Sequence, residues 1–370
     1  MAMRRDYLIH TATLAGCFLG NSTPAKEILE TFGSASAIFE MGRDDALQRY
    51  PPLEQIAGRL FSGRTAADAA RDIDWALEHD VNIIAYTDSD YPARLKQCPD
   101  PPLLLYTKGR CDFSRPRFAA IVGTRASTQW GRRYCEKIVE GLALLPVKPV
   151  IVSGLALGID THAHTFALKY GLDTVAVMGT GFDQIYPPAN EALAAGILCH
   201  GALVTEFSPF TPSYPINFVR RNRIIAGLSD LTLVVESKVK GGGLITANLA
   251  QDYNRSVFAV PGRMDDNTFR GCNELIENNV AAIATGAQSI IRAMGWDIDP
   301  TLPLDTAPAA AEPDRVKSEI LRFLRENPES DIQSIAVALG SDSRNIALPL
   351  LELELAGAVT IVSGNKYAAK

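Results

Sequence analysis

The chain repeats one local pattern, a short apolar strand that ends in glycine and runs into a helix. The pattern occurs at Ile121-Val122-Gly123 and Val152-Ser153-Gly154, and again within residues 175–181, 234–243 and 257–262. Glycine at the end of a strand lets the backbone turn sharply without a Cβ in the way. Five such strands predict an α/β fold with one doubly wound, mostly parallel, Rossmann-like sheet.

The carboxyl ends of these strands are expected to share one edge of the sheet. Helices that begin there direct free amide groups and the positive ends of their dipoles outward, so this edge is expected to bind anions. The alternative is that the glycines only close tight turns between strands and helices. No turn matches the dinucleotide pattern G-x-G-x-x-G, and no cofactor is expected.

The length of 370 residues indicates more than one domain. Residues 1–80 predict a small helical domain of the SAM or helix-hairpin-helix type, with a helix start at Ser22 or Thr23. Residues 81–296 hold the alternating strands and helices and form the expected Rossmann-like domain.

The C-terminal part is expected to be a separate domain behind a linker. Residues 297–313 contain four prolines and a run of alanines, a composition typical of a linker. Residues 314–370 predict three helices and two strands around a turn at 363–365, which is a winged-helix order. The third helix, 341–356, carries more acidic than basic residues, which favours a partner-binding or regulatory role at least as much as DNA reading.

Charge is unevenly distributed along the chain. The whole chain has a net charge of −6, yet residues 100–296 carry 19 Lys and Arg against 16 Asp and Glu. A polyanion is therefore expected on the central domain. The most basic run lies on a predicted helix, 217–227, where Arg220, Arg221, Asn222 and Arg223 follow one another. These side chains suit phosphate contacts, and the alternative is a solvated or ion-paired helix face.

The evidence for catalysis or metal binding is weak. Asp160, His162 and His164 are ligand types, but residues two apart on a helix do not face each other, so no metal site is expected. No Ser-His-Asp order and no P-loop stands out. The six cysteines form no C-x-x-C pair, and neither a signal peptide nor a membrane span is evident, which predicts a reduced, cytoplasmic protein.

The glycine and arginine motifs resemble the DNA-processing protein DprA (Smf) family. The resemblance covers about 120–285 in six ordered blocks, which are Gly123-Thr124-Arg125, Ser153-Gly154-Leu155-Ala156-Leu157-Gly158-Ile159-Asp160, Gly179-Thr180-Gly181 with Tyr186-Pro187, Arg221-Asn222-Arg223 through Ser229, Leu244-Ile245-Thr246-Ala247, and Val257-Phe258-Ala259-Val260-Pro261-Gly262. The helical and winged-helix flanks are also similar to the family's layout.

The resemblance implies a protein without enzymatic activity that binds single-stranded DNA, dimerises through its Rossmann-like domain, protects incoming DNA and loads the recombinase RecA in natural transformation. By the resemblance Arg125 is the first phosphate contact, followed by Arg221 and Arg223, and Lys169 is added from the helix after Gly158. The expected DNA-binding residues are Gly123, Arg125, Ser153, Gly154, Gly158, Lys169, Arg220, Arg221, Asn222 and Arg223. Trp130, Tyr186 and Phe218 are the aromatic residues that could stack on bases.

Two other classes of function compete with this interpretation. The lysine-decarboxylase-like phosphoribohydrolases have a similar sheet and a glycine-rich turn followed by a glutamate. The corresponding run here, 240–248, has no acidic residue in reach to act as general acid or base. A winged-helix transcription factor would bind duplex DNA tightly, which the acidic C-terminal domain disfavours.

Overall fold

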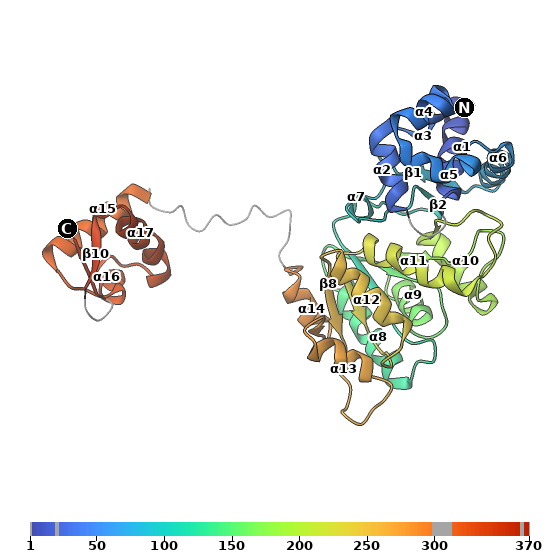
Figure 1. Cartoon of the computed structure of the whole chain (residues 1–370). Coiled ribbons are helices and arrows are strands. Elements are labelled where there is room, and N and C mark those ends of the chain that lie inside the picture. Colours follow the sequence, from blue (N-terminus) through green and yellow to red (C-terminus); the bar gives the residue numbers. More distant parts are fainter. Residues whose placement is uncertain (1, 19–21, 298–312, 363–365, 370) are drawn as a thin grey trace. The chain divides into compact units, whose positions relative to one another are not determined.

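The computed structural model describes residues 2–18, 22–297, 313–362 and 366–369 (Figure 1). The chain divides into two compact units, Met1–Asp297 and Ile298–Lys370. The first unit contains the large sheet, and the second is a small helical fold with a hairpin.

The first unit is built on a nine-stranded sheet in the order β1-β2-β6-β5-β4-β3-β7-β8-β9. Neighbouring strands from β6 to β9 in this order are parallel, whereas β1 and β2 add an antiparallel edge. The mostly parallel α/β sheet expected from the glycine-ended strands is thereby confirmed. The strands are β1 (Asn82–Ala85), β2 (Leu104–Gly109), β3 (Phe118–Val122), β4 (Val150–Ser153), β5 (Thr174–Val177), β6 (Gly201–Thr205), β7 (Leu231–Val234), β8 (Ser256–Ala259) and β9 (Ala282–Ile283).

The strand order reverses between β3 and β7. From β3 the chain proceeds to β4, β5 and β6 on one side and then to β7, β8 and β9 on the other. Doubly wound sheets leave a crevice for ligands outside the carboxyl ends of the strands at such a switch point. The glycine pattern did not predict β6 and β9, because β6 does not end in glycine and β9 is only two residues long.

Helices cover both faces of the sheet, as alternation of side chains along each strand requires. Ala119 and Ile121 of β3 pack with α8 (Gln129–Ala143), α9 (Ile159–Lys169) and α14 (Ala287–Ala293). Ala120 and Val122 belong instead to the core that includes α11 (Pro215–Leu228), α12 (Gly242–Asp252) and α13 (Arg270–Glu277). The remaining elements are α7 (Ala93–Lys96), η2 (Pro188–Asn190) and α10 (Glu191–Cys199).

The first eighty residues are helical, as expected, and they pack onto the antiparallel edge of the sheet (Figure 1). Leu8 and Ile73 share a core with Ile83 and Tyr106 of β1 and β2, so the helices and the sheet form a continuous interior. Ser22 precedes α2, but its hydroxyl donates to the carbonyl of Asp100 (2.9 Å) and does not cap the helix. The helices are α1 (Ala2–Gly16), α2 (Thr23–Phe32), α3 (Ala35–Met41), α4 (Arg43–Arg49), η1 (Pro51–Leu53), α5 (Glu54–Leu60) and α6 (Gly63–Glu78).

The second unit contains the expected order of three helices and two strands. These are α15 (Pro313–Glu326), α16 (Ile332–Ala338), α17 (Ser343–Leu355), and β10 (Val359–Val362) paired antiparallel with β11 (Lys366–Ala369). Its assignment as a winged helix and the domain boundaries stay predictions. The expected turn at 363–365 and all but the ends of the linker at 297–313 lie outside the described residues. Among the residues that are described, no helix is long and apolar enough to cross a bilayer.

Candidate functional site

The loops that follow β3 and β7 meet at the switch point. The amide of Thr124 donates to the carbonyl of Glu236 (2.8 Å), and the Glu236 carboxylate accepts from the amide (2.9 Å) and hydroxyl (3.1 Å) of Thr128. Thr128 also caps α8, because its hydroxyl accepts from the amide of Gly131 (3.1 Å). Glu236 is fully buried, so its carboxylate fixes the loop 123–128 from beneath.

Two glycines let the loops at this edge approach each other. A Cβ on Gly123 would collide with the side chain of Ile159 and the carbonyl of Glu236. Gly158 has a φ of +80°, and a Cβ there would collide with the backbone of Thr124 and Arg125. The alternative reading of these glycines, as residues that allow close packing of turns, therefore explains both positions without a ligand.

Arg125 is the exposed cation of the loop after β3. Its guanidinium carbon lies 5.6 Å from the ring centre of Phe218 on α11, an attractive arrangement of a cation over an aromatic face. The ring of Tyr186 lies 5.2 Å from that of Phe218, and Tyr186 is 40% exposed. Three residues named from the sequence, one cationic and two aromatic, therefore meet at the switch point.

Arg221 is buried beneath this edge, with only 3% of its surface exposed. Its guanidinium donates to the carbonyls of Gly154 and Val177, at the ends of β4 and β5. Burial lowers the pKa of Arg221 to about 10, against the opposing influence of the Asp160 charge, and burial raises the pKa of Asp160. Gly154 has no room for a side chain, because a Cβ would collide with this guanidinium.

The other members of the basic run divide between the interior and the surface. Arg223 is buried and donates to the carboxylate of Glu206 and to the carbonyl of Asp100 (2.8 Å). Arg220 and Asn222 are half-buried. The run therefore does not form one phosphate-binding face, since two of its three arginines point into the protein.

Ser153 is buried at the end of β4, and Lys169 lies away from the edge where the loops meet. Ser153 is fully buried, and its hydroxyl donates to the carbonyl of Ile121 (2.6 Å). Lys169 lies at the last position of α9, about 15 Å along the helix axis from its start at the sheet edge. Its ammonium pairs with Glu136 (2.5 Å), so the expectation that Lys169 belongs to the rim does not fit its position.

Asp160, His162 and His164 point to different partners. Asp160 accepts from the amide of Ala156 (3.3 Å), and His162 hydrogen-bonds Ser127 (3.0 Å). His164 is fully buried against Thr174 (2.7 Å). Within the described ranges, no group of three or more His, Cys, Asp or Glu side chains could hold a metal ion.

The buried His164 predicts a dependence of stability on pH. Burial lowers the pKa of His164 to about 3, whereas histidine in an unfolded chain titrates near ~6.5. Below that value the unfolded chain binds a proton that the folded protein excludes, so stability should fall by ~1.4 kcal/mol per pH unit toward pH 3. Between pH 7 and 5 this group should remove about 2 kcal/mol of the free energy of unfolding.

Urea unfolding of the wild type and His164→Asn at pH 5 and 7 checks this expectation. The variant should be less stable at pH 7 but lose less stability on acidification, whereas the exposed His200→Asn should keep the wild-type difference. An identical loss in wild type and His164→Asn would contradict the assignment.

Residues 82–295 match the family model described as DNA recombination-mediator protein A. The chain belongs to this family. Among the relatives of the chain, Protein Smf of Synechocystis sp. is 36% identical over 319 residues, 76% of this chain and 78% of that protein. DNA processing protein DprA of Streptococcus pneumoniae is 41% identical over 199 residues, 54% of this chain and 70% of that protein. The family resemblance of the motifs is confirmed.

Two solved structures of the DNA recombination-mediator protein A family share the fold. DprA from Streptococcus pneumoniae is 35% identical, with a TM-score of 0.58 over 69% of this chain and 90% of that one. DprA from Helicobacter pylori is 29% identical, with a TM-score of 0.53 over 59% of this chain and 97% of that one, and its structure is described as giving insight into a single-stranded DNA binding mode.

Sequence reasoning missed the part that Glu236 plays at the switch point. The glycine-rich run 240–248 contains no acidic residue, but the carboxylate that lies under this edge, that of Glu236, precedes the run. The available signal was a charged residue directly after an apolar strand, at the position where strand ends converge. Because both bonds from Thr128 go to one carboxylate oxygen, Glu236 also retains a buried oxygen without a hydrogen bond among the described residues.

Proposed function

We propose that the sheet edge at the switch point binds single-stranded DNA, and the placement of Arg125 is the observation that carries this proposal. Arg125 is exposed, its loop is fixed on Glu236, and its guanidinium is held over Phe218. A guanidinium oriented in this way can donate paired hydrogen bonds to a phosphate with little loss of side-chain freedom. Gly123 and Gly158 allow the close packing of loops that holds Arg125 in this position.

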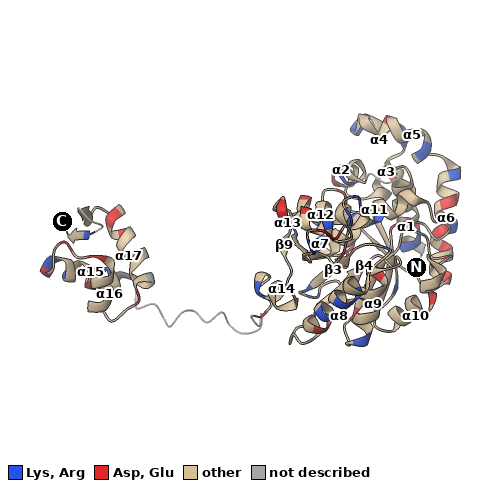
Figure 2. Ribbon diagram, turned by 90° about the horizontal axis from the view of Figure 1, so that it is seen from below, with Lys and Arg blue, Asp and Glu red and all other residues tan. Residues whose placement is uncertain are grey.

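Aromatic side chains next to Arg125 supply surfaces on which bases can stack. Tyr186 is exposed beside Phe218, and Trp130 in the first turn of α8 is 55% exposed. The Arg133 guanidinium lies 5.7 Å from the Trp130 ring centre, and α8 also carries the exposed residues Arg132 and Lys137. Figure 2 shows basic positions on this helix in blue. Single strands bind to surfaces where cations contact the nucleic-acid backbone and aromatic rings stack on the bases. Because any base can stack, such binding has no strong sequence preference.

The remaining candidate residues fall into two roles in this proposal. Asn222 is half-buried on α11 and contacts the strand in this proposal, whereas the half-buried Arg220 lies on the side of α11 that faces the N-terminal helices. Arg221, Arg223 and the Ser153–Gly154 turn hold the strand ends in place from the interior.

We place this binding activity in the handling of incoming DNA during natural transformation. The protein would protect the single strand and load the RecA recombinase onto it, acting in the cytoplasm as a homodimer through the Rossmann-like domain and without catalysis of its own. Family membership and the names of its DNA-processing relatives support this role, and so does the single-stranded DNA binding described for the Helicobacter pylori relative.

Fluorescence anisotropy with a labelled oligo-dT strand and a duplex of equal length, across a salt series, tests the proposal. The single strand should bind more tightly than the duplex. The logarithm of its binding constant should fall linearly with the logarithm of the salt concentration, with a slope of ~0.7 for each phosphate contact. Equal affinity for strand and duplex, or no binding of either at low salt, would count against the proposal.

A further inference from the structure

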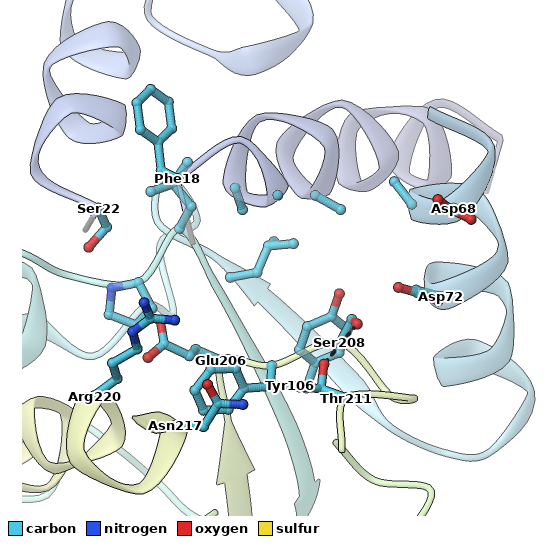
Figure 3. A pocket seen from close by; sticks show the side chains of 18 of the residues that line it. Phe18, Ser22, Asp68, Asp72, Tyr106, Glu206, Ser208, Thr211, Asn217 and Arg220 are labelled. Carbon is cyan, nitrogen blue, oxygen red and sulfur yellow. Dashed lines mark hydrogen bonds between the residues drawn. The ribbon is translucent and has the colours of Figure 1, made fainter. Parts of the chain in front are cut away.

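A cavity of about 460 Å³ lies between the N-terminal helices and the sheet (Figure 3). Helices α1 and α6 line one side, and β2, the loop 206–214 and the first turns of α11 line the other. Its volume is in the range of pockets that enclose small molecules. The loop after β3 does not contribute to it, so the cavity is separate from the site of Arg125.

A carboxylate oxygen of this cavity is buried without a hydrogen-bond partner among the described residues. It is Oε1 of Glu206. Asn217 and Tyr106 line the cavity beside it as polar side chains, and these residues are only 4% and 3% exposed. Figure 3 shows Tyr106, Glu206 and Asn217 together on one side of the cavity. A buried carboxylate oxygen is normally satisfied, so the unpaired Oε1 of Glu206 points to a ligand that donates a hydrogen bond to it.

The charges around the cavity leave one cation available. Asp68 and Asp72 on α6 are paired with Arg71, and the second Glu206 oxygen is paired with Arg223. Arg220 is half-buried and has no ion pair or hydrogen bond from its guanidinium in the described parts of the chain. An anionic group on the ligand would therefore be placed at Arg220, on the side of the cavity where Figure 3 shows it.

Part of the remaining lining is apolar, beside the hydroxyl groups of Ser22, Thr65, Ser208 and Thr211. Its apolar members are mostly small or aliphatic, and they include Ala12 and Ala15 of α1, Leu103, Leu104, and Ile216 from the start of α11. Such walls suit a flat, largely apolar ring that stacks between them and presents polar atoms only at its edge.

We propose that this cavity binds a nucleotide whose base carries an exocyclic amino group. The amino group would donate to Oε1 of Glu206, and the Asn217 amide would pair with the amino group and the neighbouring ring nitrogen, as asparagine does with adenine. The phosphate would bind Arg220. The nucleotide can be a free mononucleotide or one residue of a bound strand, and both present the same groups to the cavity.

Calorimetric titration of the full chain with dAMP and dTMP tests the ligand, because thymine lacks an exocyclic amino group. We expect dAMP to bind at least about tenfold more tightly than dTMP. Tyr106→Phe and Asn217→Ala should each weaken dAMP binding about fivefold or more. Tyr86→Phe removes a hydroxyl from another buried tyrosine that does not line the cavity, and should leave dAMP affinity unchanged.

The source of the nucleotide is tested by anisotropy with an oligo-dT strand and the same strand carrying one central adenine. Tight dAMP binding that both variants weaken assigns the cavity to free nucleotides. If dAMP does not bind, but the central adenine raises the affinity of the strand and both variants abolish this increase, the cavity is assigned to a base of a bound strand. The proposal is overturned if neither assay distinguishes adenine from thymine. It is also overturned if the two variants change neither the affinity for dAMP nor the affinity for the adenine-containing strand. Arg125→Ala should leave dAMP affinity intact, which separates this test from failure of strand binding at the sheet edge.

Discussion

Arg221→Leu is expected to lower the free energy of unfolding by roughly 2–5 kcal/mol, because two buried carbonyls would each lose a charged donor at roughly 1–3 kcal/mol apiece. The guanidinium of Arg221 satisfies the carbonyls of Gly154 and Val177, and leucine can satisfy neither. Asp160 would also lose the cation that compensates its charge, although burial already raises its pKa. Because two strand ends depend on one side chain, the loss should exceed that of an ordinary surface arginine.

Urea unfolding at pH 7, followed by circular dichroism, measures this effect, and Arg220→Leu is the matched control. Arg220 precedes Arg221 on the same helix, is half-buried and makes no ion pair within the described residues, so its replacement should change stability by less than about 0.5 kcal/mol. Gly154→Ala should destabilise as well, since its Cβ would displace the buried guanidinium. Equal stability of the Arg221 and Arg220 variants would refute the structural role of Arg221.

The basic run on α11 shows where sequence reasoning reaches its limit. Helical spacing establishes that Arg220 and Arg221 point in different directions, and the apolar residues after Arg223 indicate which face is buried. Helical spacing does not establish that the buried face of α11 accommodates two arginines. The acceptors that make this possible are the carbonyls of Gly154 and Val177 and the carboxylate of Glu206, which come from strand ends distant in sequence.

The sheet was easier to predict than the site because its signal is local. An apolar run followed by glycine and a helix is visible within about 15 residues, and it located β3, β4, β5, β7 and β8. The switch point depends on strand order, which no local pattern specifies, and the position of Glu236 beneath it follows only from that order. Arg125 could be placed correctly because it directly follows a strand that ends there.

Arg125→Ala is expected to weaken binding of an oligo-dT strand about 10- to 100-fold, the effect of losing a charge-assisted hydrogen bond to phosphate. The substitution also removes the cation above Phe218 but no buried contact, since Arg125 is exposed. Stability should therefore change little, and the salt dependence of binding should decrease by about one phosphate contact. Anisotropy titrations across a salt series, with unfolding curves of the same samples, measure both quantities.

Lys169→Ala is the matched control, because Lys169 is also an exposed cation, yet it lies at the far end of α9 and pairs with Glu136. Its loss should leave affinity within about twofold of wild type, since a screened surface charge contributes little at that distance. Arg125→Lys should restore only part of the affinity, because an ammonium cannot donate the paired hydrogen bonds of a guanidinium. If Arg125→Ala and Lys169→Ala weakened binding equally, the strand would be attracted by the overall charge of the protein. This result would contradict the proposal that the strand binds at the switch point.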